Sequence, residues 1–216
     1  VPADSLYEVD DSISWSEGCL LDTNAIALGC STRGNIQPGD SVAVLGTGTV
    51  GLLCLQHAKA MGASNVIAIG SPSRNQLASD LGADHTVSYK DDDVVEQVLE
   101  LTDGVGVDTT LEAAGSSVGY MQAVAFTRKG GTISLDGIPN ENEQTLPIAD
   151  IVKQEIDLRG ARAHANLAEA SAKMVANGQT DVSALITHEF DFDEFDEAWD
   201  TFTERRDGAI KVALLF

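Results

Sequence analysis

Cysteine, basic side chains and long apolar runs are scarce in this sequence of 216 residues. The cysteines Cys19, Cys30 and Cys54 form no Cys-x-x-Cys pair, and so sparse and odd a set fits a reducing compartment better than a disulfide framework. No apolar run approaches the roughly 20 residues that a membrane helix needs. The first residues show no basic-then-apolar signal peptide. The sequence therefore predicts a cytoplasmic protein without a membrane partner.

Basic residues are outnumbered, because 13 Lys and Arg face 34 Asp and Glu and give a net charge of −21. A surface of this sign repels phosphate backbones, so the composition argues against nucleic-acid binding. One interpretation is an ordinary acidic surface that keeps the protein soluble. The other is adaptation to high salt, where ions screen the repulsion between like charges. Because the acidic excess is spread along the whole chain, we favour the halophilic interpretation.

Apolar runs of strand length alternate with segments of helical periodicity through the middle of the chain. Strands that alternate with helices of about a dozen residues are typical of βαβ units and a parallel sheet. The sequence therefore predicts an α/β fold, with a doubly wound parallel sheet and helices on both faces. The expected strands are 41–46, 65–70, 85–89, 107–114 and 131–138, and the expected helices are 49–62, 73–82, 92–102 and 117–130.

The two ends of the chain follow a different pattern and show no core of their own. One helix near the C-terminus is amphipathic and carries Phe195, Trp199 and Phe202. An apolar stripe of this size seldom stays exposed, so the helix either docks on the sheet domain or forms a contact between chains. We favour the contact between chains and expect a homo-oligomer. The expected elements are helices at 16–34, 148–155, 166–178 and 193–205, and extended segments at 156–163, 184–190 and 209–216.

A glycine motif stands between the first expected strand and the helix that follows it. The first glycine permits a tight turn, the second lets the backbone approach a pyrophosphate, and the third lets the helix pack closely on the strand. The helix N-terminus adds free N–H groups and a partial positive charge. A sheet with an empty loop is the alternative. The spacing Gly-x-Gly-x-x-Gly predicts a Rossmann-type dinucleotide site at Gly46, Thr47, Gly48, Thr49, Val50 and Gly51.

Several stretches together resemble the medium-chain, zinc-dependent alcohol dehydrogenase family. They are "GDSVAVLGTGTVGLLCLQHAKAMGASNVIAIG", "LGADHTVSY", "GVGVDTTLEAAGS", "GGTISLDG" and "LITHEFDFDEFDEAWDTF". The similarity runs in order over nearly the whole chain and is greatest to microbial NADP-dependent secondary-alcohol dehydrogenases. Most of the N-terminal catalytic lobe of that family, with its upstream zinc ligands, has no counterpart in this sequence. We therefore expect a truncated chain.

The resemblance also implies a division of the chain into three parts. Residues 1–32 correspond to a remnant and hinge helix of the catalytic lobe. Residues 33–163 correspond to the dinucleotide-binding Rossmann domain. Residues 164–216 correspond to C-terminal segments that pack with the catalytic lobe.

The end of the second expected strand bears on the choice of cofactor. A carboxylate there would bind both ribose hydroxyls and repel a 2′-phosphate, whereas Gly70 and Ser71 carry no charge and leave room. Arg74 can then pair with the phosphate. NADP-using relatives also end this strand in Gly-Ser and place a tyrosine after the next strand, which corresponds to Tyr89. The alternative is that residues 71–73 cap the following helix and that Arg74 is solvated. We predict NADP rather than NAD.

Three further contacts to the cofactor follow from the fold and the resemblance. Ligands of such sheets sit at the carboxyl ends of the strands, so the nicotinamide half is expected beside Ala114-Gly115 and Gly137-Ile138. The resemblance implies that Lys211, just before the last strand, reaches the pyrophosphate. An ordinary surface lysine is the equally weighted alternative.

Asp22 is the one candidate metal ligand in the sequence. From the residues alone, an exposed aspartate on the outer face of a helix is the better interpretation. The resemblance implies instead that Asp22 is the third protein ligand of a catalytic zinc. Zinc needs three protein ligands and a water, so one carboxylate cannot hold it. We expect zinc in the complete enzyme and no turnover by this chain alone.

On these grounds we predict hydride transfer between NADP(H) and a small alcohol or ketone, with this chain as the cofactor-binding part. A zinc-free reductase of the quinone oxidoreductase kind is one alternative, against which Asp22 argues. A non-catalytic nucleotide-binding module is another. The apolar helix 16–34 and the C-terminal segments without a core argue against that module.

Overall fold

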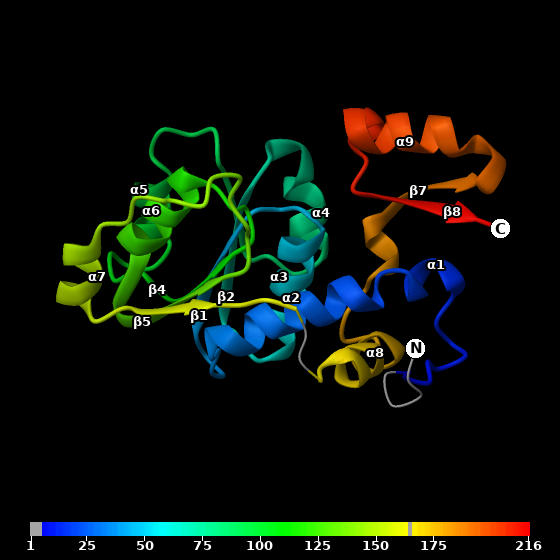
Figure 1. Ribbon diagram of the computed structural model, residues 1–216. Helices are drawn as coiled ribbons and strands as arrows, with labels where there is room; N and C mark the ends of the chain where they lie inside the picture. Colours follow the sequence, from blue (N-terminus) through cyan, green and yellow to red (C-terminus); the bar gives the residue numbers. More distant parts are fainter. Residues whose placement is uncertain (1–5, 164–165) are drawn as a thin grey trace.

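The computed structural model describes residues 6–163 and 166–216, so parts of two predicted segments, 1–5 and 164–165, lie outside the description (Figure 1). A parallel sheet forms its centre, with the strand order β3-β2-β1-β4-β5-β6. The order reverses direction between β1 and β4, and ligands of such sheets bind outside the carboxyl ends of the strands at that point. The strands are β1 Ser41–Leu45, β2 Asn65–Gly70, β3 His85–Ser88, β4 Val107–Glu112, β5 Thr127–Leu135 and β6 Asp157–Gly160.

Helices cover both faces of this sheet, as the sequence predicts. Alternate residues of β1 enter opposite halves of the core, because successive side chains of a strand point to opposite faces. Val42 and Val44 pack on the side of α2 and α3, whereas Ala43 and Leu45 pack on the side of α5 and α6. The helices are α2 Leu21–Gly34, α3 Thr49–Ala60, α4 Asn75–Asp80, α5 Val94–Glu100, α6 Ser117–Phe126 and α7 Ile148–Gln154.

The C-terminal elements and α1 lie together at one end of the molecule, away from α5, α6 and α7 (Figure 1). They share the core of the sheet domain, because Val182, Leu185 and Ile210 are buried in the same cluster as α2 and α3. Two parallel strands, β7 and β8, form a small second sheet. The elements are α1 Trp15–Gly18, α8 Ala168–Ala176, β7 Ile186–Asp191, α9 Phe195–Glu204 and β8 Lys211–Leu215, with short 3₁₀ turns at Ser183–Leu185, Phe192–Glu194 and Arg206–Gly208.

Polar contacts fix these C-terminal elements to the sheet domain. The side chain of Gln56 accepts from the backbone N–H of Asp181 at 2.6 Å and donates to its carbonyl at 3.1 Å. The Asn24 amide donates to the Ser171 hydroxyl at 2.9 Å, and both side chains are buried. These hydrogen bonds hold the C-terminal part in a fixed position relative to the sheet domain.

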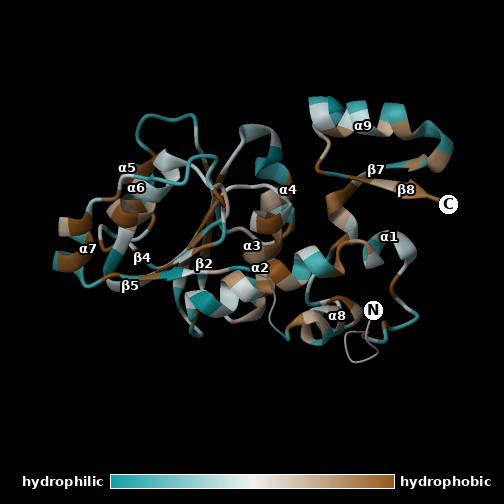
Figure 2. Ribbon diagram, in the orientation of Figure 1, coloured by the Kyte–Doolittle hydropathy of each residue, from teal (hydrophilic) through white to brown (hydrophobic). Residues whose placement is uncertain are grey.

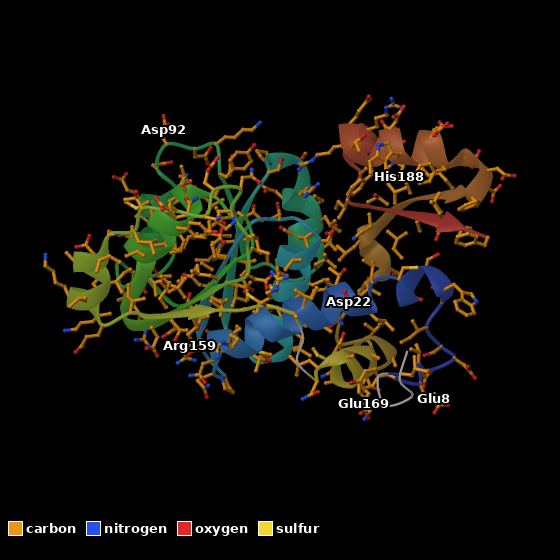
Figure 3. The ribbon with its side chains drawn as sticks, in the orientation of Figure 1. Glu8, Asp22, Asp92, Arg159, Glu169 and His188 are labelled. Carbon is orange, nitrogen blue, oxygen red and sulfur yellow. The ribbon has the colours of Figure 1, made fainter. Side chains whose placement is uncertain are left out.

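Most element ends differ from the sequence-based expectation by a few residues, and two differences are larger. The helix expected at 117–130 ends at Phe126, because Thr127 takes extended angles and pairs with Val107 at the start of β5. The helix expected at 16–34 is two helices: a capping box of Ser14 and Glu17 starts α1, and the chain turns at Cys19 and Leu20, where the Leu20 N–H donates to the Glu17 carbonyl, before α2 begins. The hydropathy colouring shows the central strands as hydrophobic and the loop that carries Asp92 as hydrophilic (Figures 2 and 3). No helix in the described ranges is long and apolar enough to cross a membrane.

Candidate functional site

A cavity of about 460 Å³ lies at the carboxyl ends of β1, β2 and β4, where the strand order reverses. None of its described lining residues is acidic, although the sequence has 34 acidic residues. Two arginines line it. The lining residues are Leu45, Gly46, Thr47, Gly48, Ile69, Gly70, Ser71, Arg74, Tyr89, Ala113, Ala114, Ser116, Val118, Gly119, Gln122 and Arg205.

The three glycines of the motif have three different surroundings. Gly46 has φ +98°, and a Cβ there would lie 3.0 Å from the Ala114 nitrogen. A Cβ at Gly51 would overlap the carbonyl oxygen of Gly46, so only glycine lets α3 pack this closely. A Cβ at Gly48 would meet nothing within 4 Å, so the loop is open on that side. These are the turn, the close packing and the open approach that a dinucleotide loop requires.

The N-terminus of α3 faces the same edge of the sheet. Gly48 is its N-cap residue and supplies no side-chain hydrogen bond. The first backbone N–H groups of a helix have no intrahelical acceptor, and the helix dipole places partial positive charge on them. The N–H groups of Thr49 and Val50 at the start of α3 are therefore suited to an anionic group.

The end of β2 is occupied by the side chain of Thr47. A Cβ at Gly70 would overlap the Oγ1 and Cγ2 atoms of Thr47 and would lie 2.6 Å from its Cβ. Rotation of the Thr47 side chain cannot relieve the last contact, because the Cβ does not move with χ1. The Thr47 hydroxyl also accepts from the backbone N–H of Ser71 at 3.1 Å. An acidic residue thus cannot replace Gly70 while Thr47 is present without a shift of the backbone.

The predicted residues around this strand end do come together. Arg74 donates from Nη1 to the Thr47 carbonyl at 2.9 Å and from Nη2 to the Ala209 carbonyl at 3.4 Å. Burial lowers the pKa of Arg74, and the charge of Arg205 lowers it further. Tyr89 is an exposed wall of the cavity, and its backbone N–H donates to the Gly70 carbonyl at 3.0 Å.

A buried carboxyl group organises the end of β4. Glu112 is fully buried and accepts from the backbone N–H groups of Ala114 at 3.1 Å and Gly115 at 2.9 Å. Burial raises its pKa to about 7, Asp136 adds to the rise, and the backbone N–H donors oppose it. Ala114 lines the cavity.

Gly115 connects this loop to the other residues predicted near the nicotinamide. It has φ +66°, and a Cβ there would lie 2.8 Å from the Ile138 carbonyl oxygen. The predicted pair Gly137 and Ile138 therefore lies beside Gly115, at the ends of neighbouring strands.

Lys211 and Asp22 lie outside this cavity. Lys211 lines a separate hollow of about 270 Å³ with Phe195, Trp199 and Phe202. Asp22 is an exposed residue in the first turn of α2, and the labelled His188 lies well away from it (Figure 3). The described residues include no group of three or more His, Cys, Asp or Glu side chains suited to a metal ion. The residues that the structure describes therefore do not form a zinc site, and the metal role of Asp22 stays a prediction.

Two residues of the site escaped the sequence reasoning. Glu112 had a detectable signal, since it is an acidic residue at the end of an apolar strand. Arg205 had none, because only the packing of the C-terminal segment brings it to the cavity.

A family model described as zinc-binding dehydrogenase matches residues 49–178, which is more than half of the chain. The chain belongs to the zinc-binding dehydrogenase family. This is a family of oxidoreductases, and the membership confirms the predicted family and the predicted enzyme class.

Individual members of the family show the same relationship. The sorbitol dehydrogenase of Bacillus subtilis is 30% identical over 210 residues, which are 97% of this chain and 60% of that protein. This chain thus spans about three fifths of the relative. A protein from Sinorhizobium meliloti, described as a zinc-binding dehydrogenase and solved with NADP bound, superposes with a TM-score of 0.92 at 26% identity, covering 100% of this chain and 64% of that one.

A third member is the 2R,3R-butanediol dehydrogenase of Bacillus subtilis, with a TM-score of 0.87 at 30% identity, covering 95% of this chain and 59% of that one. These superpositions confirm the predicted Rossmann-type fold. They place the helices and the parallel sheet of this chain in the arrangement common to the family.

Proposed function

We propose that this chain is the cofactor-binding part of a dehydrogenase that transfers hydride between NADP(H) and a small alcohol or ketone. The observation that carries the proposal is the cavity at the ends of β1, β2 and β4, which has a glycine loop, two arginines and no acidic residue among its described lining. An acidic residue at the end of β2 would repel a 2′-phosphate, and Gly70 stands there instead.

Each part of the cavity has a separate task in this proposal. The N-terminus of α3 binds the pyrophosphate through its backbone N–H groups. The end of β2, with Ser71 beside Gly70, receives the 2′-phosphate. The loop after β4, held by Glu112, supports the nicotinamide half, and bound nicotinamide supplies the hydride donor or acceptor. The named relatives act on sorbitol and butanediol, which supports an alcohol or its ketone as the substrate.

The direct test is a titration of the purified chain with NADPH and with NADH, followed by nucleotide fluorescence. Charge-assisted hydrogen bonds contribute roughly 1.5–3 kcal/mol each, so we expect NADPH to bind about 10- to 100-fold more tightly. Equal or tighter binding of NADH would contradict the proposed preference. Failure to bind either nucleotide would contradict the proposed function as a whole.

The contact between Thr47 and Gly70 determines which variants can reverse the preference. Gly70→Asp alone is expected to lower the melting temperature by several degrees, because overpacking costs about 1–3 kcal/mol. The double variant Thr47→Gly/Gly70→Asp removes the obstructing side chain, so it is expected to fold and to prefer NADH. Thr47→Gly alone is the control and should keep the NADPH preference. A double variant that still prefers NADPH would count against the role assigned to the end of β2.

A further inference from the structure

Arg205 reaches the cavity from the C-terminal part of the chain. It directly follows α9 and ends that helix in the left-handed conformation, with φ 55°. Its backbone N–H donates to the carbonyl of Phe202 at 3.4 Å. The end of α9 therefore sets the position of Arg205, and its side chain lines the same cavity as Gly48, Ser71 and Arg74.

Two of the five N–H donors of Arg74 are engaged by backbone carbonyls of the protein. Its two terminal nitrogens bind the carbonyl oxygens of Thr47 and Ala209. These two bonds join the glycine loop to the segment just after Arg205. Arg74 therefore works as an anchor between two parts of the fold, and only part of its guanidinium remains for a ligand.

Arg205 differs from its neighbour Arg206 in its partners. Arg206 pairs with Glu204 at 2.7 Å and with Asp200 at 3.6 Å. Within the described ranges, no carboxylate lies within ion-pair distance of Arg205. This is notable in a chain with 34 acidic and 13 basic residues, where a carboxylate is the commonest charged neighbour.

The proximity of two arginines without an acidic partner has an electrostatic cost. Like charges at short range repel, and the repulsion grows as water is excluded. The charge of Arg205 accordingly contributes to the lowered pKa of Arg74, after burial. An anion bound between the two guanidinium groups would remove this cost, and phosphate groups match the geometry of guanidinium donors.

We propose that Arg205 pairs with a phosphate group of the bound dinucleotide, and that Arg74 chiefly holds the glycine loop against the C-terminal segment. This inference rests on the proposed function, because it names a further binding residue of the same cavity. Under this proposal, residues from two parts of the chain form the cofactor site, namely the sheet domain and the end of α9. Either the 2′-phosphate or the pyrophosphate can supply the anion, and both present the same chemistry to Arg205.

The test compares Arg205→Gln with Arg206→Gln, which removes the same charge one residue away. Titrations with NADPH and NADH give the dissociation constants of both variants and the wild type. Loss of a charged hydrogen bond predicts about a 10- to 100-fold weaker binding for Arg205→Gln. Arg206→Gln breaks only exposed ion pairs, so its dissociation constants should stay within about twofold of the wild type. Arg205→Lys keeps the charge and should recover part of the affinity.

The two nucleotides distinguish the possible anions. A loss for NADPH alone would assign Arg205 to the 2′-phosphate, and an equal loss for both would assign it to the pyrophosphate. Unchanged binding of both nucleotides by a folded Arg205→Gln variant would overturn the inference and leave the proposed function intact. An equal loss in Arg206→Gln would also overturn it, since the effect would then be one of general charge. A wild-type chain that binds neither nucleotide would overturn the function and the inference together.

Discussion

Glu112 is fully buried, and it accepts a hydrogen bond from the backbone N–H of Ala114, which lines the cavity. Buried carboxyl groups are costly to ionise, and the backbone N–H groups of Ala114 and Gly115 offset only part of the cost. Asp136, whose own pKa is raised by burial, and the Tyr120 hydroxyl are the other ionisable groups near it. The protonation state of Glu112 therefore bears on the hydrogen bonds that hold the loop with Ala114 and Gly115.

The raised pKa of Glu112 predicts a specific pH dependence of stability. The pKa of Glu112 is about 7 in the folded chain against 4.5 for an ordinary glutamate. Between these two pH values the folded state therefore holds a proton that the unfolded state has lost. Its stabilising contribution is full below pH 4.5 and is lost as the pH rises through 7. His57 acts in the opposite sense, since burial lowers its pKa to about 4 and its contribution grows as the pH rises toward 6.5.

We predict that Glu112→Gln becomes more stable relative to the wild type as the pH rises from 5 to 8. Glutamine keeps an acceptor oxygen for the backbone N–H groups and cannot ionise. The relative gain is at most about 3 kcal/mol, from the shift of the pKa. Denaturant unfolding at several pH values measures it, and the difference between the two proteins cancels the contribution of His57. Glu96→Gln, an exposed substitution on α5, should show a flat difference. A flat difference for Glu112→Gln as well would rule out the raised pKa.

At the residue scale, the sequence predicts those site residues whose role follows from local geometry. Gly46 and Gly51 were predictable, because a tight turn and a close helix–strand contact each exclude a side chain. The close contact of Thr47 with Gly70, which excludes a side chain at position 70, was not predictable, since it depends on how the loop after β1 lies against the end of β2. The place of Arg205 could not be predicted either, because Arg205 and Arg74 are far apart in the sequence and only the fold brings them to the same cavity.

At the element scale, α9 presents aromatic side chains that the described chain leaves half exposed. Phe195 and Trp199 stack with ring centroids 6.1 Å apart, and Trp199 is 57% exposed. Next to them, Phe192 stacks on Phe216, whose side chain is also exposed. These residues, with the hollow between α9 and β8, form an apolar face that contact with another chain would bury.

We predict that the chain self-associates through the face of α9, and that Trp199→Ser weakens the association. Each square ångström of apolar surface returned to water costs about 25 cal/mol, so loss of a tryptophan at a contact shifts the equilibrium by more than tenfold. Light scattering over a range of protein concentrations measures the effect. Trp15→Ser is the matched control, because Trp15 is 93% exposed on α1. A wild-type chain that stays monomeric at all concentrations would refute the contact.

The elements themselves were predicted more reliably than their ends. Gly62 and Gly82 follow α3 and α4 with φ values of +94° and +106°, so the glycine that ends each helix is a local signal. The start of β5 was misplaced because Gly130, with φ +68°, gives the same signal after α6 has already ended, whereas the extended form of Thr127 accompanies its pairing with Val107 of β4. Tertiary pairing of this kind overrides the local preference.

At the scale of the whole molecule, the net charge of −21 is the dominant feature. Repulsion among like charges opposes the compact state, and dissolved ions shorten its range from about 10 Å at 0.1 M to about 3 Å at 1 M. The ion pairs within the described ranges are partly or largely exposed, for example Lys173 with Glu169 and Lys129 with Glu155. Exposed ion pairs contribute little to folding stability. Salt therefore destabilises the chain less by screening these pairs than it stabilises the chain by screening the general repulsion.

We therefore predict that the melting temperature rises between 0.1 M and 2 M KCl. A variant with Asp91, Asp92 and Asp93 changed to Asn gives a direct check of the cause. Asparagine keeps an oxygen for the bonds that Gln97 donates to Asp91 and Asp93, while the net charge becomes less negative. If repulsion is the cause, the variant melts at a higher temperature than the wild type in 0.1 M KCl and gains less from added salt. A melting temperature that falls or stays level with KCl would remove the halophilic interpretation. If added KCl raises the melting temperature of both proteins equally, the cause is instead that salt strengthens the burial of apolar surface, an effect that does not depend on charge.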